Sequence, residues 1–289
     1  MELQQFWIRT DKLNELYEIW KKIKTYGEDR PPSVLRTAQA EKILEKVLLH
    51  CRSIIRLFDV VLDDCTEADI ALIASAARNI MDSGNVYFYV TERGISEEEV
   101  NFRYNLQIMN YDRNIKDILK KLEFPQDCFR MRLLDHDFVI DEIKESSIYI
   151  GANEQDRKRI LSGKQFFKKK RPGIFTTEME SAIFNLLSNS VHSFYIGLSN
   201  NSVNKSAVFM SYIDAVMLCM ISVETAVVYM ANILNDYLQL RKQLVKALTA
   251  EEKKKIKELM STEYIETYLE AQRKEFGKEL FQINRKIFP

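Results

Sequence analysis

Hydrophobic residues recur along this chain at spacings of three and four, which is the period of an amphipathic helix. The clearest stretch begins after Ser33, a favourable N-cap, and continues to about Asp64 with apolar positions such as Leu44, Val47 and Cys51. Only eight glycines and five prolines occur in 289 residues, so turns are few and elements are long. The pattern predicts an all-α fold, an irregular multi-helix bundle of about eight or nine helices.

Caps and prolines indicate where these helices begin and end. Pro31 and Pro32 end the first helix, Ser96 opens the fourth, and Thr177 opens a later one. The expected helices cover about 2–26, 33–64, 66–90, 96–124, one or two short pieces within 126–163, then 177–198, 206–248 and two charged helices from about 249 and 261. We expect a single helical domain over 1–289, which the sequence also allows to be two packed halves, 1–122 and 123–289.

The stretch from about 206 to 248 is apolar enough to raise the question of a membrane span. Asp214 and Glu224 lie within it, and an acid at the centre of a bilayer costs roughly 2.5–3.5 kcal/mol on insertion scales. We therefore expect a buried central helix of a soluble bundle and no membrane span.

Charge and cysteine content narrow the class of protein. Lys and Arg number 42 and Asp and Glu number 42, so no global charge drives binding to nucleic acid or acidic membranes. The four cysteines form no CxxC pair and the N-terminal residues have no apolar run typical of a secretory signal, which favours a reducing, cytoplasmic location. The chain has no GxGxxG, GxxxxGK[ST], HExxH or GxSxG motif, so we expect neither a cofactor nor a metal.

One long segment, Ser181–Asn204, contains no Lys, Arg, Asp or Glu, although 29% of the chain is charged. At helical spacing its polar side chains share one face, made of Ser181, Asn185, Ser188, His192 and Tyr195. A solvated face would normally carry Lys or Glu. Two interpretations stay open: an interface between helices or subunits, and a ligand cleft in which His192 acts as an acid or base.

A catalytic partner for His192 would have to come from another helix. Arg78 follows the small apolar run ALIASAA and is paired by spacing with Asp82, so it lies where helices pack closely. We take His192 and Arg78 as the leading catalytic candidates, beside the alternative that Arg78 and Asp82 form a structural ion pair.

A second candidate pair is Arg130 and His136, which five residues separate. This spacing matches the Arg-x4-6-His motif of HEPN ribonucleases, in which Arg and His act on the 2′-hydroxyl of RNA, although a Met follows Arg130 where that family usually has a polar residue.

A basic loop lies at residues 164–171, shortly before the uncharged segment. Its charged and aromatic members are Lys164, Phe166, Phe167, Lys168, Lys169, Lys170 and Arg171. Basic and aromatic residues together suit contact with phosphates and stacking on bases, so the loop is a candidate RNA contact; phenylalanines that anchor a solvated loop explain the same residues.

Four segments together resemble a group of bacterial all-helical proteins of unknown function that have been loosely compared with HEPN domains. They read AARNIMDSGNVYFYV, SEEEVNFRYNLQIMNYDR, RILSGK and FNLLSNSVHS, and they fall within about 66–198. The resemblance implies an all-α fold and places Arg78 and His192 at the characteristic positions. It supplies no established activity, and Asp82 stands where that family often has Glu.

The function that these observations favour is a non-enzymatic binding or assembly module that forms a homo-oligomer. The alternative is a metal-independent ribonuclease that uses His192 or His136 with Arg78 or Arg130 and holds RNA with the basic loop. The sequence leaves the ligand, the partner and the occupant of the uncharged face open.

Overall fold

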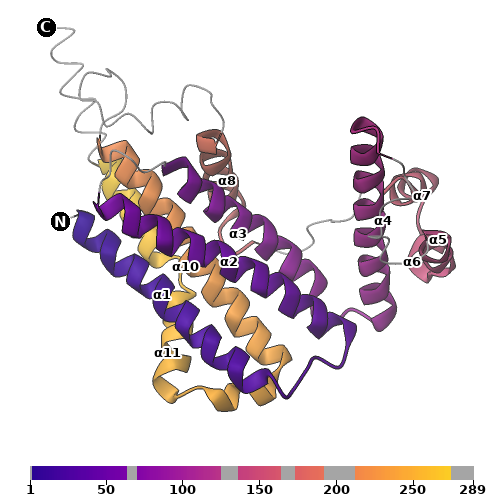
Figure 1. Ribbon diagram of the computed structural model, residues 1–289, viewed down its shortest axis with the longest axis horizontal. Coiled ribbons are helices and arrows are strands. Elements are labelled where there is room, and N and C mark those ends of the chain that lie inside the picture. The colour runs from indigo at the N-terminus through magenta and orange to yellow at the C-terminus, as the bar shows by residue number, and fades with distance from the viewer. Residues whose placement is uncertain (1, 64–69, 125–135, 164–172, 192–211, 275–289) are drawn as a thin grey trace, which may run out of the picture. The chain divides into compact units, whose positions relative to one another are not determined.

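The computed structural model describes residues 2–63, 70–124, 136–163, 173–191 and 212–274, and within these ranges it contains helices and turns but no strand (Figure 1). The all-α prediction is therefore confirmed. The helices are α1 (Glu2–Gly27), α2 (Leu35–Asp63), α3 (Ile70–Val90), α4 (Glu97–Lys121), α5 (His136–Glu145), α6 (Ser147–Ile150), α7 (Glu154–Leu161), α8 (Thr177–Val191), α10 (Tyr212–Leu240), the 3-10 helix η2 (Lys242–Ala247) and α11 (Ala250–Leu259), with residues 263–274 also helical.

Helices α1, α2 and α4 begin and end within a few residues of the positions that caps and prolines predict. The apolar stretch expected to be one helix over 206–248 instead contains α10, which ends at Leu240, and the separate 3-10 helix η2. The hydroxyl of Ser96 accepts a hydrogen bond of 3.1 Å from the backbone N–H of Glu99 and so caps α4 as expected. The described part of 126–163 holds three helices, α5 to α7, where one or two were expected. The segments FVIDEI and SSIYIGA, which have some strand character in sequence, lie mainly in α5 and α6.

The chain divides into two compact units that alternate along the sequence. Unit 1 comprises Met1–Pro31, Leu44–Gly84 and Pro172–Pro289, and unit 2 comprises Pro32–Ile43 and Asn85–Arg171. Helices α2 and α3 each contribute to both units, so the division does not follow a break near residue 122.

Unit 1 is built around α10. Residues 218–231 of α10 are buried without interruption, which makes it the central helix of the unit. Helix α1 packs along α10 through Leu13, Leu16, Trp20 and Ile23, whose spacing of three and four forms one stripe. The rings of Trp20 and Tyr237 meet edge to face with 5.6 Å between centroids.

By length and composition, the part of α10 from Val216 to Leu240 would suffice to cross a membrane. In its most apolar window 83% is buried inside the protein. Burial on this scale is what a central core helix requires, and the same length and composition also occur in core helices of soluble proteins.

Unit 2 has its own small core between α4 and the helices α5 and α7. Phe102, Leu106 and Met109 of α4 pack with Val139 and Ile143 of α5. The turn after α7 places Gly163 at a φ of +61°, and a Cβ there would lie 3.1 Å from the carbonyl oxygen of Met109. Glycine is therefore required at this position of the RILSGK segment.

A buried arginine stabilises unit 2 as well. Arg103 is 2% exposed and forms ion pairs of 2.7 Å with Glu92 and 2.5 Å with Glu99. It also donates to the carbonyl oxygen of Tyr89 and lies 4.2 Å from the centre of that ring. Its hydrogen bonds are thus used within the unit, which makes Arg103 a structural residue.

Candidate functional site

The uncharged segment forms α8 in its described part, and α8 buries one side and exposes the other. Ile183 and Leu187 are buried, whereas Ser181 and Asn185 are exposed and Ser188 is half-buried. The polar face expected from spacing is thus the outward side of α8. We call it the α8 face and define it by the side chains Ser181, Ala182, Asn185, Ser188 and Asn189, none of which is charged.

Two members of the expected face, His192 and Tyr195, lie outside the described residues. The start of α8 is one residue away from the expected cap. The hydroxyl of Thr176, not that of Thr177, accepts a hydrogen bond of 3.3 Å from the backbone N–H of Met179. The chain offers two threonines in succession, and the one that precedes the first helical residue is the one able to reach a free N–H group.

Contacts with α10 hold α8 by its inner side. The hydroxyl of Tyr229 donates to Oε1 of the buried Glu180 at 3.4 Å, and the ring of Phe175 lies 5.9 Å from the ring of Tyr229. Helix α3 also approaches Tyr229 closely, because a Cβ on Gly84 would lie 2.5 Å from its Cδ1 atom. These contacts fix which side of α8 faces outward.

The side chain of Arg78 on α3 contacts α8. Its guanidinium lies 5.2 Å from the centre of the Phe184 ring, and its Nε is 3.9 Å from a carboxylate oxygen of Asp82. That distance exceeds a hydrogen bond, and Arg78 Nε is buried without a hydrogen-bond partner. Burial raises the pKa of Asp82 above its usual value, against the opposing charges of Arg78 and Lys46. The arrangement is a loose ion pair beside an aromatic ring.

The structure describes little of the second candidate pair, Arg130 and His136, or of the basic loop. The backbone of His136 begins α5, but its side chain and the whole of Arg130 lie outside the described residues. The basic loop, with Lys164, Phe166, Phe167, Lys168, Lys169, Lys170 and Arg171, lies outside them too. The pairing of Arg130 with His136 and the role of the loop therefore stay predictions.

The strongest polar contact of unit 1 was not foreseen. Arg9 of α1 donates from Nε and Nη2 to the two carboxylate oxygens of Glu224 on α10, each at 2.6 Å, and the two side chains are 12% and 1% exposed. The guanidinium also lies 4.3 Å from the centre of the Tyr264 ring. Burial raises the pKa of Glu224, against the effect of Arg9. Glu224, one of the two acids that make a membrane span unfavourable, is thus paired with a cation inside unit 1.

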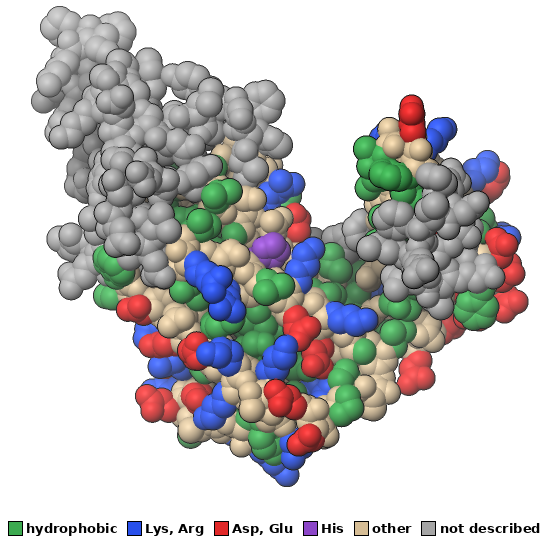
Figure 2. All heavy atoms as spheres, viewed as in Figure 1, with side chains coloured by type: hydrophobic (Ala, Val, Ile, Leu, Met, Phe, Trp, Pro, Cys, Tyr) green, Lys and Arg blue, Asp and Glu red, His purple; other side chains and the backbone are tan. Residues whose placement is uncertain are grey.

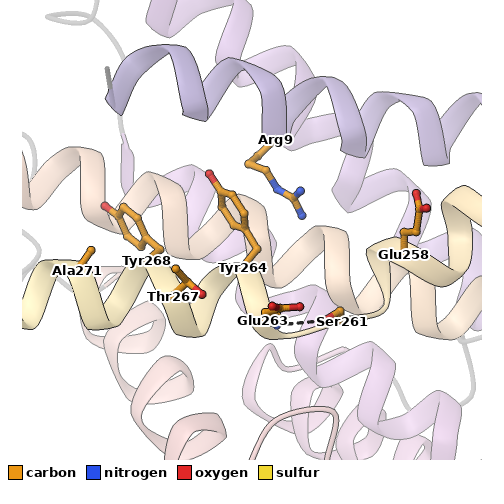
Figure 3. Close-up of a pocket in the computed structure, with 8 residues that line it drawn as sticks. All are labelled: Arg9, Glu258, Ser261, Glu263, Tyr264, Thr267, Tyr268 and Ala271. Atoms are coloured by element: carbon orange, nitrogen blue, oxygen red, sulfur yellow. Dashed lines mark hydrogen bonds between the residues drawn. The ribbon is translucent and has the colours of Figure 1, made fainter.

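A pocket of about 460 Å³ opens beside this contact, between α1 and the helix of residues 263–274 (Figure 3). Two tyrosines of that helix, Tyr264 and Tyr268, line it, and the hydroxyl of Ser261 accepts a hydrogen bond of 3.2 Å from the backbone N–H of Glu263 at its rim. Because both oxygens of Glu224 already bind Arg9, the guanidinium contributes little net charge to the pocket.

The described residues contain no group of three His, Cys, Asp or Glu side chains that could hold a metal ion. The thiols of Cys51 and Cys219 are free and buried, and burial raises the pKa of both, that of Cys219 to about 12. A thiol with a raised pKa stays protonated at neutral pH and is a poor nucleophile. These two cysteines therefore act as apolar core residues.

The chain matches no protein-family model, no curated protein and no solved structure. Its function therefore has to be argued from the chemistry of the surfaces and sites described above.

Proposed function

We propose that the protein is a non-enzymatic helical binding and assembly module that forms a homo-oligomer through the α8 face. One observation carries the proposal: Ser181 and Asn185 are exposed on α8, within a segment that has no charged residue from Ser181 to Asn204. An outward helix face that only meets water normally carries charged side chains.

The side chains of the α8 face suit contact with an identical surface. In a two-fold contact the same patch lies on both partners, so each group meets groups of its own kind. The amides of Asn185 and Asn189 and the hydroxyl of Ser181 both donate and accept, which lets two copies satisfy each other. Identical charges across such an axis would repel.

Size favours the same contact. Ser181, Asn185 and Asn189 are small or short and follow one another at four-residue steps. Such a row forms a shallow ridge, and ridges of this spacing pack into the grooves of a second helix.

The proposal is tested by measuring oligomeric state with sedimentation velocity over a range of protein concentrations. We expect the natural protein to associate and Asn185→Lys to remain monomeric with an unchanged melting temperature. Asn79→Lys is the matched control, because Asn79 is also exposed in unit 1 but lies on α3. A natural protein that stays monomeric at all concentrations, or loss of association in the control alone, would contradict the proposal.

The alternative of a metal-independent ribonuclease makes a separate prediction. Purified protein would cleave mixed RNA in EDTA, and His192→Ala or His136→Ala would abolish cleavage while the fold persists. We expect no cleavage. A cytoplasmic location belongs to the same proposal, and the free thiols of Cys51 and Cys219 support a reducing compartment.

A further inference from the structure

The outward side of α2 carries an excess of positive charge. Between residues 46 and 56 the exposed side chains are Lys46, Leu49, Arg52, Ser53 and Arg56, and no acid is among them. We call these five residues the basic face of α2. On the side of the molecule that Figure 2 shows, basic and acidic side chains lie interspersed. From Lys46 to Arg56 the helix rises about 15 Å. Three cations therefore follow one side of a straight rod.

Several other cations of unit 1 have acidic partners within the chain. Lys21 pairs with Glu18 at 2.9 Å and Lys22 with Glu252 at 3.0 Å, and the half-buried Lys12 and Lys255 both pair with Glu15. With the side chains that the structure describes, which leave out those of residues 59–63, Lys46, Arg52 and Arg56 form no ion pair or hydrogen bond. A net charge of zero over the whole chain therefore conceals a local surplus on α2.

Among the acids whose side chains the structure describes, the two nearest to this face already have other basic neighbours. Glu45 of α2 binds Lys24 of α1 at 2.8 Å. Asp82 of α3 is close enough for Lys46 to affect its pKa, but Asp82 also faces Arg78. Burial, and then the charge of Lys46, lower the pKa of His50, which keeps that ring neutral beside the face. The three cations are therefore open to an anion from outside the chain.

We propose that the basic face of α2 binds the phosphate backbone of single-stranded nucleic acid without sequence preference. A guanidinium matches phosphate oxygens in geometry, and two of the three cations are arginines. Leu49, which is 66% exposed between them, offers an apolar contact for a sugar or base. A flexible strand can bring successive phosphates to a straight row of cations.

The same surface does not suit other anionic partners. Helix α2 buries its apolar stripe, including Cys51, Ile54 and Phe58, in the unit, so it has no apolar side with which to enter a membrane. A protein interface of ordinary size needs several apolar or aromatic anchors, and this face has only Leu49.

The test is fluorescence anisotropy with a labelled single-stranded oligouridine at several salt concentrations. With three phosphates neutralised, log K should fall with log[salt] at a slope of about −2, so affinity drops about twentyfold between about 50 and 200 mM salt. In Arg52→Gln/Arg56→Gln one cation remains, and the drop shrinks to about threefold. Lys21→Gln/Lys254→Gln is the control, because it removes two lysines that already have acidic partners.

The inference stands independently of association through α8, which is measured without nucleic acid. It is supported if the α2 variant loses affinity and salt dependence while the control keeps both, with equal melting temperatures. It is overturned if oligouridine does not bind at about 50 mM salt, or if both variants lose the same affinity. Binding of duplex DNA, polyglutamate or anionic vesicles in preference to oligouridine also overturns it.

Discussion

In unit 1, α8 and the part of α2 from Leu44 onwards are alike in burial and opposite in surface chemistry. Each buries an apolar stripe, with Leu187 in α8 and Ile54 in α2 fully enclosed. The exposed side of α8 carries hydroxyls and amides, whereas that of α2 carries Lys46, Arg52 and Arg56. The same hydrophobic period therefore packs both helices into unit 1, and their outward residues are what differs in chemistry.

This difference restricts which partner each face accepts. Amides and hydroxyls satisfy their own kind across a two-fold axis, so the α8 face suits a second copy. Unpaired cations repel their own kind, so the basic face of α2 suits a polyanion. The following predictions challenge that division, beginning with the largest expected effect.

The largest difference in stability should be between replacing the mostly buried, paired Arg9 and replacing the exposed, unpaired Arg52. Arg9→Gln removes the partner of Glu224 and leaves a carboxylate 1% exposed, which should lower the free energy of unfolding by about 3–5 kcal/mol. Arg52→Gln removes an exposed, unpaired cation and should change it by less than about 0.5 kcal/mol. Urea denaturation measures both. A similar cost for the two would show that the cations of α2 are structural.

Substitutions on the buried side and on the exposed side of α8 should also differ in their cost to stability. Leu187→Ala opens a cavity at a fully buried site and should cost about 2–5 kcal/mol. Asn185→Ala changes an exposed side chain and should leave the free energy of unfolding of the monomer within about 0.5 kcal/mol. Thermal denaturation at low protein concentration measures the comparison. If Asn185→Ala costs as much as Leu187→Ala, the α8 face belongs to the interior of the monomer.

Charge swaps can sharpen the claim that α8 meets a copy of itself. Asn185→Lys and Asn185→Glu should each weaken association at least about tenfold, which corresponds to about 1.4 kcal/mol. Mixing the two variants places opposite charges across the contact and should restore association. Sedimentation of the two variants alone and mixed measures this. A mixture no more associated than its components would argue against a symmetric contact through residue 185.

The smallest expected effect is a pH dependence beside the basic face. Burial first, and then the charge of Lys46, lower the pKa of His50 below its usual 6.5. Between the lowered value and 6.5 the unfolded chain binds more protons, so the stability contribution of His50 is lost as pH falls through this window. In His50→Gln the loss of unfolding free energy below pH 6.5 should therefore be smaller than in the natural protein. In Lys46→Gln the pKa of His50, followed by NMR, should rise.

The sequence predicts the helices well because their apolar period and caps are local signals. Ser96 caps α4 as expected, and the split of α8 into an apolar side with Leu187 and a polar side with Asn185 is visible from spacing alone. Three short helices in 136–163 were harder to foresee, since helices of four to ten residues carry too few periods to resolve.

Contacts between distant segments could not be predicted in the same way. Arg9 and Glu224 are 215 residues apart, and a lone arginine in a charged helix gives no sign of a buried partner. The basic face of α2 is also hidden in sequence, because Glu45 and Lys46 are neighbours and read as a mixed surface. In the structure Glu45 pairs with Lys24 of α1, so it does not neutralise Lys46.

The central claim, that α8 meets a second copy, is tested most directly by hydrogen–deuterium exchange of the natural protein at low and high concentration. Association should slow exchange in peptides that cover residues 178–191, while peptides of α2 over residues 46–56 exchange at the same rate at both concentrations. Exchange across α8 that does not depend on concentration, or protection that appears at α2 instead, would contradict the account.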